Sequence, residues 1–148
     1  MRRTTFAVSL VAGTLFVAFG AIGFEGPPKA DDAAAKLIGT WKLTSAKYDG
    51  EESDLTKSGT TLKHITPGNF IWVTYDSDTK EVSRTAGGTY TLDGEKYEET
   101  PRYGRGADFE AVRDKPHTFT LKLEGDSWKH SGALANGLKI EEVWERVK

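Results

Sequence analysis

One histidine and one glutamate in this sequence are spaced so that they could meet and do chemistry. His130 lies in a predicted strand at 127–134, Glu142 in another at 138–147, and Ala135-Asn136-Gly137 separates the two. A three-residue turn pairs the strands with His130 opposite Glu142, whereas a two-residue turn moves the residues apart. We favour the longer turn because it places both apolar faces on the same side. A facing His and Glu can form a charge-assisted pair, a proton-transfer dyad or part of a metal site.

The structural interpretation of this pair, in which it only satisfies polar groups inside the domain or at its rim, is the commoner one. The catalytic alternative is proton transfer on a bound ligand by His130 and Glu142, helped by Tyr97 or Arg102. Nucleophilic catalysis has no motif here, because the sequence has no cysteine and no serine in a Gly-x-Ser-x-Gly motif. We therefore expect binding rather than catalysis.

Metal-ligating side chains are few. The histidines are His64, His117 and His130, and no two of them are spaced as His-x-His or His-x-x-x-His. We predict no metal site and no cofactor.

The candidate residues lie in short segments where polar and apolar residues alternate, which is the pattern of half-buried strands. Pro67-Gly68, Asp93-Gly94 and Gly125-Asp126 mark tight turns between them. Longer excursions occupy 51–59 and 105–115, the second with a short helix at 107–115. The predicted strands are 39–48, 61–66, 69–76, 81–92, 95–103, 117–124, 127–134 and 138–147.

Eight strands joined mainly by hairpins predict an all-β, antiparallel up-and-down barrel, because closing the sheet removes its open edges. Gly87-Gly88 lies within a strand and predicts a bulge or sharp bend that lets the barrel close. A two-sheet sandwich is the alternative, but most connections look too short for its crossovers.

Alternation along the strands also predicts the lining of the lumen. On the strand at 95–103, alternation gives Tyr97, Glu99 and Tyr103 the same parity. The mixture of aromatic, polar and aliphatic side chains suits a small hydrophobic or amphipathic ligand better than a plain acyl chain. The alternative is a structural or interaction domain whose own side chains fill the barrel. The predicted ligand-binding residues are Trp72, Tyr97, Glu99, Phe119, His130 and Glu142.

The first 23 residues have the composition of a secretory signal. Arg2 and Arg3 precede an uncharged apolar run at 6–24 that ends in small residues suitable for cleavage. We predict a signal peptide at 1–23, a linker at 24–36 with room for one helical turn at its end, and the barrel domain at 37–148. The mature protein is then periplasmic or secreted and has no membrane span. A retained N-terminal anchor is the alternative.

Charge and cysteine content exclude several classes of partner. Removal of residues 1–23 changes the formal charge from −2 to −4, since the segment contains two arginines and no acidic residue. Without a basic cluster, binding to nucleic acid is not expected. The absence of cysteine excludes disulfides and a lipid-modified N-terminal cysteine. The sequence gives no indication of oligomeric state.

The sequence Gly39-Thr40-Trp41-Lys42-Leu43 on the first predicted strand resembles the opening signature of the calycins, the superfamily of lipocalins and fatty-acid-binding proteins. In those families the Trp closes one end of the barrel and a basic residue of the last strand packs over it. Arg146 stands at that position, after Trp144 in "EEVWERVK". Residues 37–148 as a whole are similar to a lipocalin-like domain of unknown function in secreted bacterial proteins. The resemblance implies a calycin fold with Gly39, Trp41, Trp144 and Arg146 as structural signature, and no assigned activity.

The sequence departs from fatty-acid-binding proteins at two places. Their two-helix lid does not fit into the nine residues at 51–59, and their carboxylate-binding Arg-x-Tyr on the last strand is here Glu142-x-Trp144. A carboxylate at that position repels an anionic head group. By analogy, some calycin barrels hold haem by a single histidine and others act as isomerases or decarboxylases. These are the family's alternatives to simple binding.

Overall fold

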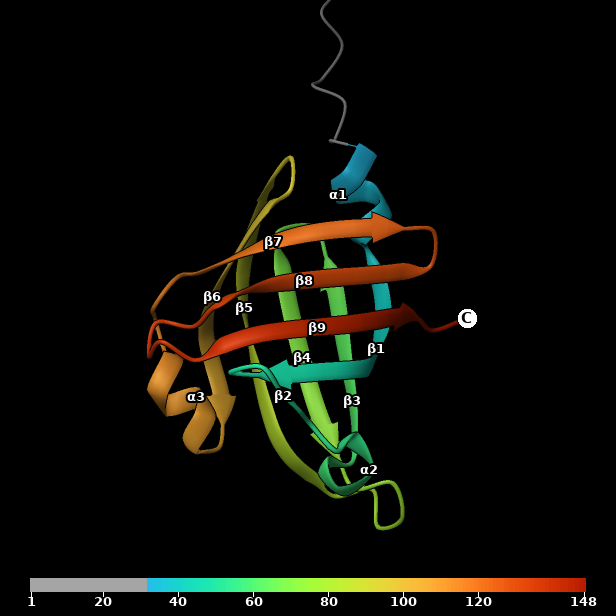
Figure 1. The fold of residues 1–148 in the computed structure, drawn as a ribbon, viewed down its shortest axis with the longest axis vertical. Helices are drawn as coiled ribbons and strands as arrows, with labels where there is room; N and C mark the ends of the chain where they lie inside the picture. Colours follow the sequence, from blue (N-terminus) through green and yellow to red (C-terminus); the bar gives the residue numbers. More distant parts are fainter. Residues whose placement is uncertain (1–31) are drawn as a thin grey trace, which may run out of the picture.

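Alternating burial along each strand builds a closed antiparallel β-barrel (Figure 1). The structure is a computed structural model that describes residues 32–148. Strand β7, for example, buries every second residue from His117 to Leu121, as expected of a strand with one face toward a core. The elements are α1 (Asp32–Leu37), β1 (Gly39–Tyr48), β2 (Glu51–Glu52), α2 (Leu55–Ser58), β3 (Thr60–Thr66), β4 (Asn69–Tyr75), β5 (Val82–Asp93), β6 (Lys96–Arg105), α3 (Ala107–Val112), β7 (His117–Glu124), β8 (Ser127–Ala133) and β9 (Lys139–Arg146).

Strands that follow one another along the chain pair as neighbours from β3 to β9, and β1 pairs with both β3 and β9, which closes the barrel. In Figure 1, β7, β8 and β9 cross over β3, β4 and β5. The predicted antiparallel barrel of eight strands is confirmed, and so is the short helix at the start of 107–115. The excursion at 51–59 also contains the two-residue strand β2, paired with the end of β1, and helix α2.

A bulge between β5 and β6 reverses the alternation at one predicted residue. The pairing shifts between Gly87, which lies opposite Tyr103, and Gly88, which lies opposite Pro101. The bulge predicted at Gly87-Gly88 is confirmed. Tyr103 is 55% exposed while Glu99 is buried, so the shared parity of the two residues does not place them on the same face. The Tyr103 ring instead covers Gly87, where an added Cβ would lie 2.5 Å from it.

Trp41 closes the barrel at the end next to α1. Its side chain is fully buried, and its Nε1 donates a hydrogen bond of 2.8 Å to the Leu37 carbonyl. The Arg146 guanidinium lies 4.2 Å over the Trp41 ring and donates a 2.9 Å hydrogen bond to the Ile38 carbonyl. A Cβ at Gly39, whose φ is 141°, would lie 2.5 Å from Arg146 Nη1, so another residue here would be strained and would displace the guanidinium. The structure thus places Arg146 over Trp41, as the family resemblance implies.

The loss of Arg146 is expected to loosen this closure. Arg146→Ala should lower the free energy of unfolding by about 2 kcal/mol, because a cation–π contact and charge-assisted hydrogen bonds disappear together. Urea unfolding followed by tryptophan fluorescence measures the change. Arg102→Ala is the matched control, since Arg102 lies in an exposed ion pair with Asp114, and it should cost less than about 0.5 kcal/mol. Equal effects of the two substitutions would contradict the closure.

A cluster of aromatic rings fills the closed end, with Trp128 at its centre. The centroid of the buried Trp128 ring lies 5.6 Å from that of Trp41, 5.5 Å from Tyr97, 5.2 Å from His130 and 5.9 Å from Trp144. These separations are in the range of favourable ring contacts. The cluster contains residues of β1, β6, β8 and β9, so it holds these strands together at the end of the barrel next to α1.

The predicted signal peptide at 1–23 lies outside the described residues, as does most of the predicted linker. The last residues of the linker lie in α1, the expected helical turn. Among residues 32–148, no helix is long and apolar enough to cross a membrane.

Candidate functional site

The barrel encloses a partly open cavity of about 510 Å³. Its wall includes residues of α2, α3 and the turn between β8 and β9, whereas the cluster around Trp41 and Trp128 fills the end next to α1. The side chains of the barrel therefore leave space in this part of the lumen. The apolar part of the wall comes mainly from Leu43, Leu55, Trp72, Val112, Phe119, Leu134, Leu138, Ile140 and Trp144.

Five of the six predicted ligand-binding residues line this cavity: Trp72, Glu99, Phe119, His130 and Glu142. The sixth, Tyr97, lies outside the cavity lining.

Tyr97 is fully buried in the aromatic cluster and does not line the cavity. Its hydroxyl donates a hydrogen bond of 2.6 Å to Glu99 Oε1. Burial, and then the neighbouring Glu99 charge, raise the pKa of Tyr97 well above its ordinary value of 10.0. Tyr97 is therefore a neutral hydrogen-bond donor to the Glu99 carboxylate.

A buried lysine on β3, which the sequence analysis did not predict, completes this group. Lys63 Nζ lies 2.5 Å from Glu99 Oε1, and the two side chains are only 3% and 8% exposed. The ammonium also lies 4.9 Å from the Trp128 ring and 5.1 Å from the Trp144 ring, with Phe70 and Tyr97 slightly farther away. One carboxylate and four aromatic faces thus replace the water that a lysine normally keeps.

The sequence did contain a usable signal for Lys63. Alternation in β3 offered two faces, with Thr61, Lys63 and Ile65 on one and Leu62 and His64 on the other, and hydropathy does not choose between them. A buried Glu99, however, needs a cationic or hydrogen-bonding partner. That requirement favours the face that contains the lysine.

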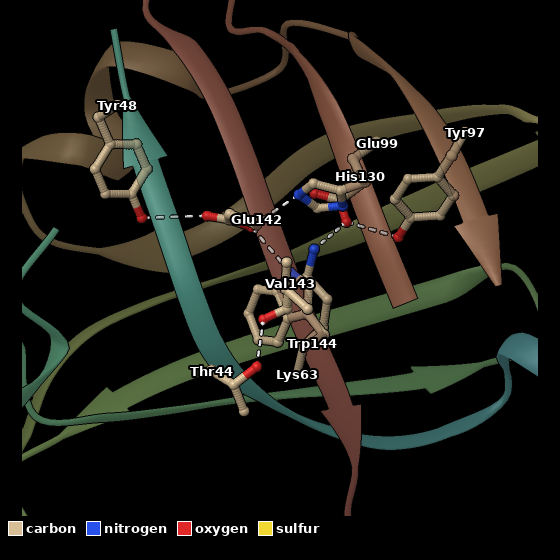
Figure 2. Close-up of polar contacts among 9 residues, drawn as sticks. All are labelled: Thr44, Tyr48, Lys63, Tyr97, Glu99, His130, Glu142, Val143 and Trp144. Atoms are coloured by element: carbon tan, nitrogen blue, oxygen red, sulfur yellow. Dashed lines mark hydrogen bonds and ion pairs between the residues drawn. The ribbon is translucent and has the colours of Figure 1, made fainter. Parts of the chain in front are cut away.

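The predicted pair of His130 and Glu142 forms (Figure 2). The two residues lie directly opposite each other on β8 and β9, joined by the three-residue turn, and His130 Nε2 is 2.8 Å from Glu142 Oε2. The Trp144 indole N–H donates to the same oxygen at 3.0 Å, and the Tyr48 hydroxyl donates to Oε1 at 3.2 Å. The Glu142 carboxylate is therefore held by three side chains.

The family to which these structural features point is also found by a comparison of sequences. The family model of a lipocalin-like domain matches residues 37–127, more than half of the chain. The chain belongs to this lipocalin-like family.

Solved structures agree with this assignment. A lipocalin-like protein from Bacteroides uniformis aligns with a TM-score of 0.56 at 17% identity, over 76% of this chain and 99% of that one. An uncharacterized protein from Bacteroides eggerthii has a TM-score of 0.50 at 17% identity, over 74% and 98%. A redesigned β-barrel has a TM-score of 0.51 at 15% identity, over 78% and 96%. At these identities the likeness is one of fold. The comparison with curated proteins found no match.

Electrostatics in this lipocalin-like barrel keep Glu142 ionised. Burial on its own raises the pKa of Glu142, but the hydrogen bond and charge of His130, followed by the charge of Lys63, lower the pKa below its ordinary value of 4.5. A carboxylate with three donors and a lowered pKa is a weak proton acceptor. Neither expected helper reaches it, because Tyr97 bonds to Glu99 and the exposed Arg102 pairs with Asp114 at 3.0 Å.

Stability should depend on pH through this carboxylate. The pKa of Glu142 is lower in the folded than in the unfolded chain, so its contribution is complete above about 4.5 and is lost as the pH falls through the folded value. Between about pH 5 and about pH 3, the urea midpoint of Glu142→Gln should therefore fall less steeply than that of the wild type. Glu141→Gln, at the exposed neighbouring position, should follow the wild-type curve. A wild-type slope for Glu142→Gln would contradict the ionised pair.

His117 contributes a third titratable side chain to the wall. The ring is 2% exposed, and its Nδ1 accepts a hydrogen bond of 3.0 Å from the Ala135 backbone N–H. Burial lowers the pKa of His117; Lys115 acts in the same direction, while the Val112 carbonyl and Glu99 act in the opposite one. The ring is thus neutral near pH 7 and carries its hydrogen on Nε2.

The third histidine lies elsewhere, since His64 shares a 3.0 Å hydrogen bond with Thr40 between β3 and β1. Within the part of the chain that the structure describes, no group of three His, Asp or Glu side chains is placed to hold a metal ion.

Proposed function

We propose that this lipocalin-like protein binds a small amphipathic molecule in the lumen of its barrel. The observation that carries the proposal is the cavity of about 510 Å³, a volume within the usual range for small-molecule sites. Trp72, Phe119 and Ile140 offer an apolar surface to such a ligand, while His117 and Glu142 bring polar groups to the same wall.

Binding is favoured over proton-transfer catalysis by the state of the candidate dyad. Glu142 is committed to three donors, and its lowered pKa reduces its strength as a base. The His130 ring stacks on Phe119, with centroids 4.7 Å apart. These contacts fix the pair in place, which suits a preformed wall that a ligand packs against.

The test is a titration of the purified full chain with N-phenyl-1-naphthylamine, an uncharged fluorophore that brightens in apolar surroundings. Saturable binding of one probe per chain is expected. Ala86→Phe adds a ring at a buried position on the cavity wall and should weaken binding by about tenfold or more. Thr89→Phe, on the exposed face of the same strand, is the matched control and should bind as the wild type does. No saturable binding, or equal binding by the two variants, would overturn the proposal.

We also propose that the protein works outside the cytoplasm, in the periplasm or after secretion. The support is the composition of residues 1–23, two arginines followed by an uncharged apolar run. N-terminal sequencing of the protein recovered from its native compartment tests this. A mature N-terminus near residue 24 is expected, and an intact residue 1 in a membrane fraction would favour the retained anchor.

A further inference from the structure

Each ionised group on the described cavity wall already has a partner. Lys63 lies 2.5 Å from Glu99, and His130 lies 2.8 Å from Glu142. Arg84, the remaining arginine or lysine of the wall, has a partner as well. A carboxylate or ammonium on a ligand would enter this low-dielectric space without a free counter-charge, and an uncompensated buried charge is costly.

Two buried ring nitrogens on the described part of the same wall have no hydrogen-bond partner, His130 Nδ1 and His117 Nε2, and the Ala135 N–H fixes the second of them as a donor. The neutral His117 ring has its Nδ1 bonded to Ala135, so the hydrogen is on Nε2, and Nε2 has no hydrogen-bond partner. The Val112 carbonyl raises the pKa of the ring as a nearby acceptor does, but it does not complete a hydrogen bond with Nε2. A buried donor without an acceptor destabilises the folded chain, and an acceptor supplied by a ligand would restore the missing hydrogen bond.

The position of His117 makes it available to a ligand. The residue begins β7 opposite Glu99 on β6, and its ring lines the cavity together with Phe119, the next residue on the same face. Nε2 itself is buried, so the ring has to shift for this atom to contact a ligand. An acceptor at His117 leaves the apolar part of the ligand beside Phe119 and Trp72.

We propose that the natural ligand is an uncharged molecule with an apolar body and a hydrogen-bond acceptor, such as a carbonyl oxygen, and that the His117 Nε2–H binds this acceptor. This inference rests on the proposed function and specifies its ligand class. It separates neutral carbonyl compounds from fatty acids and from amines of the same length, because only the neutral compounds bring no further charge beside the Lys63–Glu99 ion pair and the Glu142 carboxylate.

The experiment compares three competitors of equal chain length, 2-decanone, decanoate and decylammonium, by their displacement of N-phenyl-1-naphthylamine from the full chain near neutral pH. The ketone should bind about tenfold or more tightly than either ion. His117→Phe should remove most of the ketone's advantage over the two ions, about five- to tenfold in affinity, with each competitor's affinity calculated from the probe affinity measured for the same variant. His64→Phe, the same change outside the lumen, should leave both unchanged.

His117→Gln is the second variant, since it keeps an N–H donor, and it should keep most of the ketone preference. Probe binding together with equal or tighter binding of either ion overturns the inference and leaves the proposed function intact. A ketone preference that His117→Phe does not reduce overturns it as well. Absence of probe binding overturns the inference together with the proposed function. The wild-type comparison of the three competitors decides the question of ligand charge even if a His117 variant does not fold.

Discussion

Glu99→Gln is expected to lower the free energy of unfolding by about 3 kcal/mol near neutral pH. The substitution keeps the size of the side chain and an acceptor for the Tyr97 hydroxyl, but it removes the charge that compensates Lys63 at 2.5 Å. The ammonium then stays buried among aromatic rings without a carboxylate. Urea unfolding, followed by tryptophan fluorescence, measures the loss.

Two further variants separate the ion pair from other effects of the change. Lys63→Met combined with Glu99→Gln removes both charges and should recover at least half of the lost stability, because the uncompensated charge is gone. Glu98→Gln changes a neighbouring carboxylate whose ion pair with Lys96 is partly exposed at 3.7 Å, and it should cost less than about 0.5 kcal/mol. A Glu99→Gln effect as small as that of Glu98→Gln would show that the pair does not stabilise the fold.

Trp128→Ala is expected to have the largest effect on stability, a loss of about 4 kcal/mol. The residue is fully buried, and its ring contacts those of Trp41, Tyr97 and Trp144. Truncation leaves a cavity where four strands meet, in a part of the barrel with no room to collapse. Thermal unfolding and urea unfolding both measure the loss of stability, and near-ultraviolet circular dichroism should show the loss of ordered aromatic rings.

Trp72→Ala is the matched comparison, because Trp72 is only partly buried and lines the cavity. It should cost less than half as much stability as Trp128→Ala, and it should weaken binding of N-phenyl-1-naphthylamine, since it removes apolar wall. The pair of variants thus distinguishes the closed, structural end of the barrel from the open, binding end. Equal losses of stability would contradict this division.

Much of the fold was predictable because local signals determine it. Turn dipeptides such as Asp93-Gly94 placed the hairpins, and period-2 alternation placed the strands between them. The closure between β1 and β9 followed from the positions of Trp41 and Arg146 relative to a known family signature. Strand β2 was not predicted, because two residues are too few to show a period.

The site was predictable where register depends on a single turn. A three-residue turn was enough to place His130 opposite Glu142. Alternation gives the face of a strand but not the depth along the barrel, which is why Tyr97 was assigned to the lumen although it lies in the aromatic cluster. Alternation also fails beyond a bulge, as at Tyr103.

Lys63 illustrates a different limit. Lysine is among the residues least often buried, so composition argues against placing it in a core. Its burial depends on partners from other strands, Glu99 on β6 and the rings of Trp128 and Trp144 on β8 and β9. No local pattern in β3 contains that information.

The most direct test of the central claim is a crystal structure of the full chain soaked with N-phenyl-1-naphthylamine. We predict electron density for one probe inside the barrel, against Trp72 and Phe119, with the Lys63–Glu99 and His130–Glu142 pairs intact beside it. Density confined to the outer surface, or a lumen occupied by rearranged side chains, would contradict the claim that this barrel is a binding site.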